Sequence, residues 1–359
     1  MYKVAASRVF HRQFSTTQIK QVNYGFIGLG QMGQHMARHI YNKLTPQDTL
    51  YVNDTLPSSS KAFIENVTSI NPANSTQLHS LPTISSFVTD VHEPLDFIIT
   101  MVPEGKHVKA IVEELVQQYQ ATGKDKSSTI TTFIDSSTID IPTSSEVHEF
   151  VKKEIPNFDF IDAPVSGGVA GARKATLSFM LSRPTKESID PKLTELINKM
   201  GANIFPCGSK HGTGLAAKLS NNYLLAVTNL AVADSFQLAK SFGLNLKDYA
   251  KLVSVSTGKC WAAVDNCPIP GVYPENNIPS EVGYEGGFVT KLTRKDLVLA
   301  TACAEYADRF LYLGEVSKHW YDKACERDDL ANRDLAVLFE WLGELEKDKE
   351  GNIVEVRQK

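Results

Sequence analysis

Short apolar runs alternate with amphipathic segments through the first half of the chain. Runs rich in Val, Ile, Leu and Phe predict buried strands, because both faces of such a strand must meet apolar side chains. They lie at residues 24–30, 50–53, 96–102 and 130–135, and two more at 158–162 and 176–181 extend the same sheet. Helical periodicity lies between them, at residues 32–44, 108–119 and 189–200. This order predicts an α/β fold with a doubly wound parallel sheet of the Rossmann type.

The pattern changes at two places further along the chain. Residues 66–94 are rich in Asn, Ser, Thr and Pro, and we expect loops with one marginal strand there. Residues 215–242 are apolar on nearly every helical face, and such a helix would span about 40 Å. A helix of this kind lies buried between domains or between subunits. Shorter helical patterns follow at residues 246–255, 294–306 and 313–326.

These changes divide the chain into two expected domains. A length of 359 residues is enough for two cores of ordinary size. The first domain, residues 21–211, contains the sheet. The second, residues 212–350, is all-α and is built on the long interdomain helix.

Composition and charge remove several classes of protein. A net charge of −4 argues against nucleic acid as a partner, and no apolar run reaches the roughly 20 residues that a membrane helix needs. The 5 cysteines form no C-x-x-C pair, which indicates neither a disulfide framework nor a zinc site. The 9 histidines show no metal-binding spacing either, so we predict no metal.

The amino terminus has the composition of a targeting segment. Residues 1–20 contain four basic residues and several Ser and Thr, and the first acidic residue of the chain is Asp48. A basic, hydroxyl-rich and acid-free segment is typical of a mitochondrial transit peptide. We therefore expect the protein in the mitochondrial matrix, the alternative being a basic tail without a targeting role.

A glycine motif follows the first strand and opens the first helix. Its six residues are Gly28, Leu29, Gly30, Gln31, Met32 and Gly33. In this setting G-x-G-x-x-G indicates a dinucleotide site, where the glycines permit a tight turn and a close approach of the pyrophosphate. Asp54, directly after the second strand, would accept hydrogen bonds from the ribose 2′-hydroxyl and repel a 2′-phosphate. We therefore expect NAD rather than NADP; a generic glycine turn and a turn-forming aspartate are the alternatives.

Two further groups of residues carry candidate chemistry. Ser166, Gly167 and Gly168 place a hydroxyl and two accessible backbone amides after a strand, which suits an anionic oxygen ligand such as a carboxylate. Lys218 and Asn222 lie one turn apart on the long apolar helix and share a face. Polar side chains at such positions are costly unless the face lines a site. The alternative for Lys218 is that its amine extends to solvent.

The ordered motifs resemble the β-hydroxyacid dehydrogenase family from about Tyr24 to Tyr306. The resemblance rests on the glycine motif and on the blocks 162–168, 212–222 and 286–297. Blocks 258–261 and 268–272 resemble the family members that act on 3-hydroxyisobutyrate in mitochondrial valine breakdown. His39, His107 and residues 182–184 depart from the family pattern, which affects the details of cofactor contact.

The resemblance implies an NAD-dependent oxidoreductase that forms a homodimer or homotetramer. It implies that Lys218 is the catalytic lysine, with Asn222 beside it, and that Ser166, Gly167 and Gly168 hold the substrate carboxylate. Besides the glycine motif and Asp54, it assigns cofactor contacts to Val102, Pro103, His107, Thr138, Phe288 and Lys295.

The expected reaction is reversible oxidation of a short 3-hydroxy acid to a semialdehyde. Lys218 would take the hydroxyl proton, with its pKa lowered by the apolar helix face and by the like charge of Lys295. The alternatives are 3-hydroxypropionate as the substrate, a catalytically inactive dinucleotide-binding scaffold, and a phosphosugar dehydrogenase. The last should show a more basic substrate turn and an NADP-type pocket, neither of which the sequence has.

Overall fold

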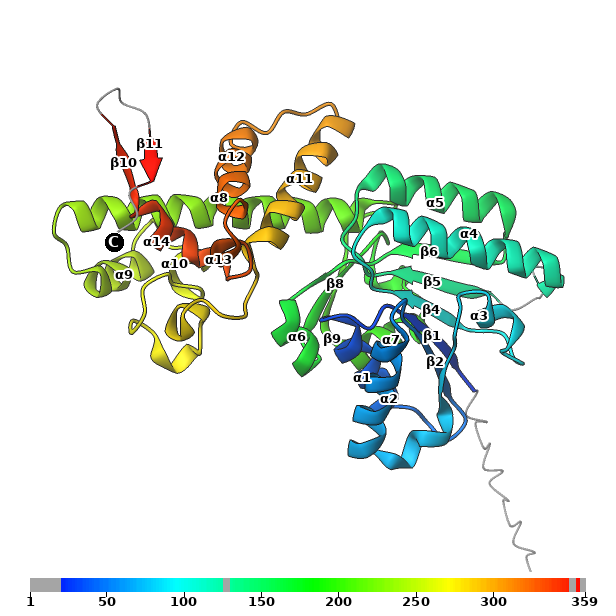
Figure 1. Ribbon diagram of the computed structural model, residues 1–359. Helices are drawn as coiled ribbons and strands as arrows, with labels where there is room; N and C mark the ends of the chain where they lie inside the picture. Colours follow the sequence, from blue (N-terminus) through cyan, green and yellow to red (C-terminus); the bar gives the residue numbers. More distant parts are fainter. Residues whose placement is uncertain (1–20, 125–129, 349–352, 356–359) are drawn as a thin grey trace, which may run out of the picture.

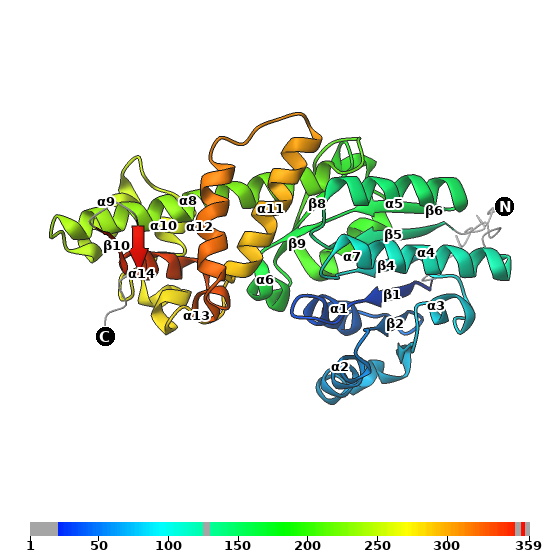
Figure 2. The same ribbon diagram turned by 45° about the horizontal axis from the view of Figure 1, so that its top comes forward.

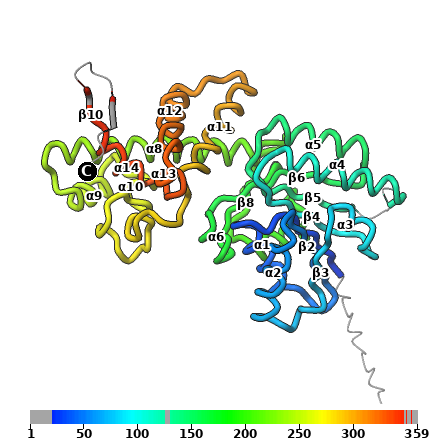
Figure 3. The backbone as a smooth tube through the Cα atoms, viewed as in Figure 1, coloured from blue at the N-terminus to red at the C-terminus, as the bar shows by residue number. Residues whose placement is uncertain are grey.

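The computed structural model describes residues 21–124, 130–348 and 353–355. The expected transit peptide, residues 1–20, lies outside the described residues. Two bodies of the chain lie side by side, and the helix α8 passes from one into the other (Figure 1). The trace in Figure 3 follows this passage from the sheet-containing body into the helical one.

A parallel sheet forms the centre of the first domain, with strand order β3-β2-β1-β4-β5-β6. The order reverses between β1 and β4, which places a crevice at the carboxyl ends of these two strands. The doubly wound Rossmann-type fold is therefore confirmed. Its strands are β1 (Asn23–Ile27), β2 (Thr49–Asn53), β3 (Leu78–Ser80), β4 (Phe97–Thr100), β5 (Thr131–Asp135) and β6 (Phe158–Asp162).

Helices cover both faces of this sheet, because successive strand residues point to opposite sides. Phe26 packs in one core with α1, α2 and α7, whereas its neighbour Ile27 packs in the other with α3, α4 and α5. Figure 2 shows helices on both sides of the strands. Their bounds are α1 (Gly33–Asn42), α2 (Pro57–Ile70), α3 (Ser86–Thr89), α4 (Gly105–Thr122), α5 (Ile141–Glu154) and α7 (Pro191–Met200).

The segment 66–94 is more ordered than its composition indicates. It contains the end of α2, a 3₁₀ helix at Pro72–Gln77, the edge strand β3 and the short helix α3. Phe63 and Val67 of α2 are buried against the sheet. Packing of these two side chains stabilises a helix whose Ser, Asn and Thr residues have weak helical propensity.

The expected strand at 176–181 does form, but it does not extend the main sheet. It is β8 (Leu177–Leu181), which lies with β7 (Val165–Ser166) and β9 (Gly201–Pro206) in a separate three-stranded sheet. Only Ala163 and Pro164 join β6 to β7. Two residues are too few for the crossover that a parallel neighbour in the same sheet needs. The chain therefore leaves the main sheet at β7, and β8 pairs antiparallel with β7.

The second domain is built around α8 (Thr213–Ser241), a helix of 29 residues and about 43 Å. Leu215 packs in the core of the first domain, whereas Phe236 packs in the core of the second. The remaining helices are α9 (Leu246–Val255), α10 (Trp261–Val264), α11 (Thr290–Tyr306), α12 (Gly314–Cys325), α13 (Asp328–Ala331) and α14 (Leu338–Leu342).

The helical domain differs from the expected all-α domain at its end, where β10 (Leu345–Lys347) pairs with β11 (Ile353–Glu355) in a small hairpin. Among the residues that the structure describes, no helix combines the length and hydropathy needed to cross a bilayer. The same residues contain no group of His, Cys, Asp and Glu side chains placed to hold a metal ion.

Candidate active site

The glycine motif forms a tight loop between β1 and α1. Gly28 adopts φ +97°, and a Cβ on it would lie 2.4 Å from the carbonyl oxygen of Met101. A Cβ on Gly33 would lie 1.9 Å from the carbonyl oxygen of Gly28, so the loop and α1 can approach only with glycine here. Gly30 instead faces open space, with no atom within 4 Å of where a Cβ would stand. A phosphate can therefore reach the backbone at Gly30 and the start of α1.

Asp54 lies beside this loop, at the carboxyl end of β2. Its Oδ2 accepts from the backbone N–H of Leu29 at 2.7 Å, and its Oδ1 accepts from that of Leu56 at 2.9 Å. The carboxylate is thus fixed against the glycine loop. A carboxylate oxygen can accept more than one hydrogen bond, so these contacts leave capacity for ribose hydroxyls. The loop and Asp54 together fit NAD.

The ends of β4 and β5 meet on the other side of the crevice. The N–H of Val102 donates to Ser137 Oγ at 2.9 Å, and Thr100 Oγ1 donates to Asp135 Oδ1 at 2.8 Å. Burial raises the pKa of Asp135 to about 6, although hydrogen bonds from Ser137 and Thr100 act against it.

Three buried polar atoms in this region have no hydrogen-bond partner in the described part of the chain. They are Asp135 Oδ2, Ser136 Oγ and, on the first turn of α4, His107 Nδ1. Unpaired buried polar atoms are uncommon and favour a site that a polar ligand or water completes. Pro103 lies exposed between these elements.

One hydrogen bond joins the candidate residues of the two domains. Lys295 on α11 donates from Nζ to the carbonyl oxygen of Thr138 at 2.8 Å. Burial lowers the pKa of Lys295, whereas the negative charges of Asp296, Glu104 and Asp135 act in the opposite direction. The helical domain therefore places the amine of Lys295 directly after the carboxyl end of β5.

The first turn of α8 is bound by buried side chains of the first domain. Asp162 at the end of β6 accepts from the N–H of Gly212 through Oδ1 and from that of Leu215 through Oδ2, both at 3.0 Å. Ser182 Oγ accepts from the N–H of Gly214 at 3.1 Å. The first N–H groups of a helix have no intrahelical partner, so these bonds fix where α8 begins. Ser182 belongs to the triplet that departs from the family pattern.

Lys218 and Asn222 follow on α8, and both are buried. Lys218 is 9% exposed and Asn222 is 3% exposed, and the amide of Asn222 donates to Asp296 Oδ2 at 2.5 Å. Asp296, on α11, is 5% exposed. The sequence analysis did not predict that Asp296 belongs to this cluster, because the residue appeared there only within the block 286–297. The signal that could have found it is an acid next to Lys295 at a position facing the interior of α11.

Burial is the main cause that lowers the pKa of Lys218, and the positive charge of Lys295 lowers it further. The negative charge of Asp296 raises it. Burial likewise raises the pKa of Asp296 against the attraction of the two lysines. For both groups, loss of water outweighs the attraction between opposite charges, so the surroundings make the ammonium of Lys218 easier to deprotonate than a lysine in water.

The turn after β7 presents backbone to the surface. Ser166 is half-buried, and Gly167 and Gly168 are exposed with φ +128° and +59°. Gly168 begins α6 (Gly168–Lys174), and no atom lies within 4 Å of where its Cβ would stand. The turn is therefore open to a ligand and depends on glycine for its shape.

Phe288 contacts none of the other candidate residues among its described contacts. Its N–H donates to Asp334 Oδ2 at 2.8 Å, and its ring packs against the core of the helical domain. The described contacts thus tie it to that domain, and none of them joins it to the strand ends that carry Val102 and Thr138.

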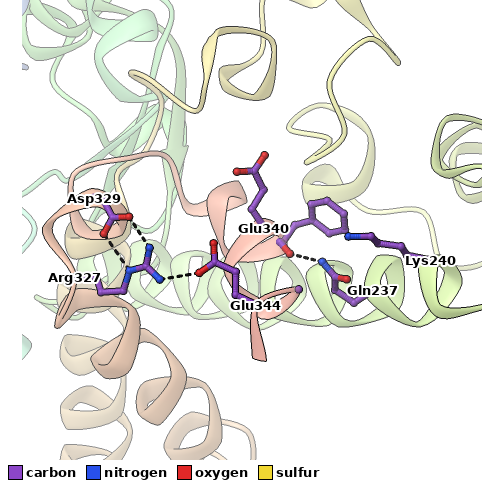
Figure 4. Close-up of a pocket in the computed structure, with 8 residues that line it drawn as sticks. Gln237, Lys240, Arg327, Asp329, Glu340 and Glu344 are labelled. Atoms are coloured by element: carbon purple, nitrogen blue, oxygen red, sulfur yellow. Dashed lines mark hydrogen bonds and ion pairs between the residues drawn. The ribbon is translucent and has the colours of Figure 1, made fainter. Parts of the chain in front are cut away.

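A cavity of about 650 Å³ lies far from these residues, near the other end of α8. Figure 4 shows its lining, in which Arg327 bonds to Asp329 and Glu344, and Gln237 bonds to the backbone of α14. Lys240, at its edge, is 22 residues beyond Lys218, or about 33 Å along the helix. This cavity takes no part in the candidate active site.

Comparison of the sequence with known proteins supports a dinucleotide-binding domain followed by a helical domain. Residues 23–208 match the model of the NAD binding domain of 6-phosphogluconate dehydrogenase. Residues 212–342 match the model described as NAD-binding of NADP-dependent 3-hydroxyisobutyrate dehydrogenase. The mitochondrial 3-hydroxyisobutyrate dehydrogenase of Drosophila melanogaster is 34% identical over 90% of this chain and 90% of its own. The human one is 35% identical over 90% of this chain and 87% of its own.

The fold is also similar to that of solved structures. A structure of Mycobacterium tuberculosis 3-hydroxyisobutyrate dehydrogenase with L-serine has a TM-score of 0.76 and 29% identity, covering 90% of this chain and 99% of that one. The protein is thus an oxidoreductase, an NAD-dependent 3-hydroxyacid dehydrogenase. Within the β-hydroxyacid dehydrogenase family, the chain belongs with the 3-hydroxyisobutyrate dehydrogenases.

Proposed function

We propose that the protein oxidises 3-hydroxyisobutyrate to methylmalonate semialdehyde, a step of valine catabolism. The observation that carries the proposal is the buried cluster of Lys218, Asn222 and Asp296, in a chain related along most of its length to enzymes named for this substrate. The mitochondrial enzymes among the relatives also support a mitochondrial location. We extend that to the matrix, with residues 1–20 as the transit peptide.

Lys218 is the proton acceptor in this mechanism. When bound, NAD accepts the hydride that leaves the carbinol carbon. The neutral amine of Lys218 takes the hydroxyl proton as the carbonyl forms, and returns it in the reverse reaction. A lowered pKa keeps a fraction of this amine unprotonated near neutral pH, which a general base requires. Asn222, fixed by Asp296, orients the hydroxyl.

The substrate carboxylate is held by Ser166 and by the backbone of Gly167 and Gly168. This assignment is supported by the exposed glycine turn, where no atom lies within 4 Å of the position that a Cβ on Gly168 would take. On the cofactor side we assign Gly28–Gly33, Asp54, Val102, Pro103, His107, Thr138, Phe288 and Lys295. The fixed carboxylate of Asp54 supports preference for NAD over NADP, since it would repel a 2′-phosphate.

The proposal also includes two domains, 21–211 and 212–350, supported by family models whose matches end and begin between residues 208 and 212. It includes assembly into a homodimer or homotetramer. Leu224 and Leu238 of α8 support this, because they are 60% and 61% exposed on an otherwise apolar helix. Large apolar side chains gathered at a surface favour association.

A substrate panel tests the reaction directly. Initial rates are measured for 3-hydroxyisobutyrate, 3-hydroxypropionate and other short 3-hydroxy acids, each with NAD and with NADP. We expect the highest kcat/KM with 3-hydroxyisobutyrate and NAD. One methyl group in an apolar pocket is worth only about 1–3 kcal/mol, so 3-hydroxypropionate should also react. A reversed ratio would make 3-hydroxypropionate the substrate, and absence of NADH formation with every acid would indicate an inactive dinucleotide-binding scaffold.

A further inference from the structure

Two side chains near the end of α1, the helix that follows the glycine loop, contact the end of α6, the helix that follows the glycine turn. His39 Nε2 lies 3.0 Å from the carbonyl oxygens of both Ala172 and Arg173, and Arg38 donates from Nη2 to the Arg173 carbonyl at 3.0 Å. Carbonyl oxygens only accept, so His39 donates through Nε2–H to both. Burial is the main cause that lowers the pKa of His39, and the neutral ring carries this proton on Nε2.

The carbonyls that His39 and Arg38 bind belong to the last turn of α6. The last carbonyls of a helix lack their usual intrahelical partners. Here the carbonyl of Ala172 also accepts from the N–H of Ala175 at 3.4 Å, and donors on α1 bind the carbonyls of both Ala172 and Arg173. α6 has only 7 residues, too few to be stable by itself in water. It ends at Ala175, which adopts φ +56°, a region unfavourable for a residue with a Cβ. Contacts from α1 therefore contribute to holding this helix in place.

The other ends of both helices carry the two proposed ligand sites. α1 starts at Gly33, the last residue of the glycine loop, and α6 starts at Gly168 in the glycine turn. A helix of 10 residues is about 15 Å long and moves as a unit. A dinucleotide bound at the glycine loop would therefore act on the same helix that carries the donors to the end of α6.

We propose that Arg38 and His39 are positioning residues that couple NAD binding at Gly28–Gly33 to carboxylate binding at Gly167–Gly168. The coupling makes the 3-hydroxy acid bind more tightly to the enzyme–dinucleotide complex than to the free enzyme. This inference rests on the proposed function for the location of the two ligands, but it does not depend on Lys218 as the base.

Binding without turnover tests the coupling. 3-Hydroxyisobutyrate is titrated by calorimetry into the full-length enzyme alone and into its complex with NADH, in which no hydride can leave the alcohol. The ratio of the two dissociation constants measures the coupling. We expect His39→Leu to reduce this ratio by about two- to tenfold, the equivalent of one lost hydrogen bond. NADH affinity in the absence of the acid should change by less than about twofold.

Three further variants separate positioning from loss of structure. His39→Gln places an amide N–H near the position of Nε2 and should retain the coupling of the wild type. Arg38→Met keeps the apolar stem but removes the donor to Arg173, and should weaken the coupling in the same direction, which provides a second measurement if His39→Leu does not fold. His35→Leu is the control, because His35 lies one turn earlier on α1 and its imidazole makes no hydrogen bond to the described residues.

The outcomes distinguish this inference from the proposed function. A coupling ratio unchanged in both His39→Leu and Arg38→Met, or a wild type without coupling, overturns the inference and leaves the reaction as proposed. Failure of the acid to bind the wild type in either state overturns the proposed substrate, and this inference with it.

Discussion

The two ends of α8 carry the same types of side chain in opposite surroundings. Near its start, Lys218 is buried, and the neighbouring Asn222 bonds to a carboxylate of another helix. Near its end, Lys240 is exposed beside a cavity of about 650 Å³. Around that cavity, Arg327 pairs with Asp329, whose side chain is 55% exposed. The start of α8 thus carries polar groups that are buried where the two domains meet, and we call it the dry end. The other end carries polar groups that are exposed to solvent, and we call it the wet end.

This difference shows that the volume of a cavity does not mark the reactive site. At the wet end, water screens each charge, and surface ion pairs of this kind contribute little. At the dry end, burial lowers the pKa of Lys218 and raises that of Asp296. Polar groups are retained in such costly surroundings where a function needs them. The comparison predicts that equivalent substitutions at the two ends have very different effects.

The largest difference is expected for the two lysines. Lys218→Ala and Lys218→Arg should both lower kcat by about 10²–10⁴-fold, the usual contribution of a general base. Arginine keeps the positive charge but does not lose its proton, so it separates proton transfer from electrostatic attraction. Lys240→Ala and Lys240→Arg, on the same helix, should leave kcat unchanged. NADH binding by fluorescence shows whether the cofactor site is intact.

Nearly normal turnover in Lys218→Arg, with NADH bound, would show that charge rather than proton transfer is what Lys218 supplies. Loss of turnover in both Lys240 variants would remove the distinction between the two ends of α8. The first result would require a different base.

The next largest difference is expected in stability, when the carboxylate that binds polar groups at each end of α8 is removed. These carboxylates belong to Asp162 and Asp329. Asp162→Ala leaves the N–H groups of Gly212 and Leu215 buried without an acceptor, which should reduce the free energy of unfolding by about 2–4 kcal/mol. Asp329→Ala removes one side of an exposed ion pair and should cost less than about 1 kcal/mol. Urea unfolding of both variants measures the two costs. Equal losses would mean that the start of α8 is no better fixed than its end.

Much of the candidate active site could be predicted from the sequence, because most of its residues belong to motifs whose members lie close together along the chain. The glycine motif, the following helix and Asp54 lie within one βαβ unit, and the spacing of Lys218 and Asn222 defines one helix face. Asp296 could not be placed in the same way, since 74 residues separate it from Asn222. Only the packing of α11 against α8 brings the two together.

The fold shows the same limit. Apolar periodicity predicted β8 correctly as a strand, because its alternating Leu177, Phe179 and Leu181 are buried. It could not assign the strand to a sheet, because pairing depends on the short connection at Ala163 and Pro164 rather than on the strand itself. The helix α2 was partly missed because two buried side chains, and not helical propensity, stabilise it.

The smallest effect is expected in the pH dependence of stability, and it also depends on the dry end. His211 lies beside the start of α8, with its Nδ1 3.4 Å from Asp162 Oδ1 and its Nε2 2.9 Å from Ser144 Oγ. Its ring stacks on that of His148. Burial lowers the pKa of His211, and His148 and Arg183 lower it further, whereas Asp162 raises it.

Because the folded pKa lies below the unfolded value near 6.5, the unfolded chain binds more protons as the pH falls. His211 therefore destabilises the fold progressively as the pH falls through about 6.5, with a slope of at most about 1.4 kcal/mol per pH unit. The slope ends below the folded pKa, where both states are protonated. His211→Asn should have a flatter profile of unfolding free energy as the pH falls below about 6.5, measured by urea unfolding at each pH. If the two profiles run parallel, then His211 is not held neutral at the start of α8, and that end is wetter than its contacts indicate.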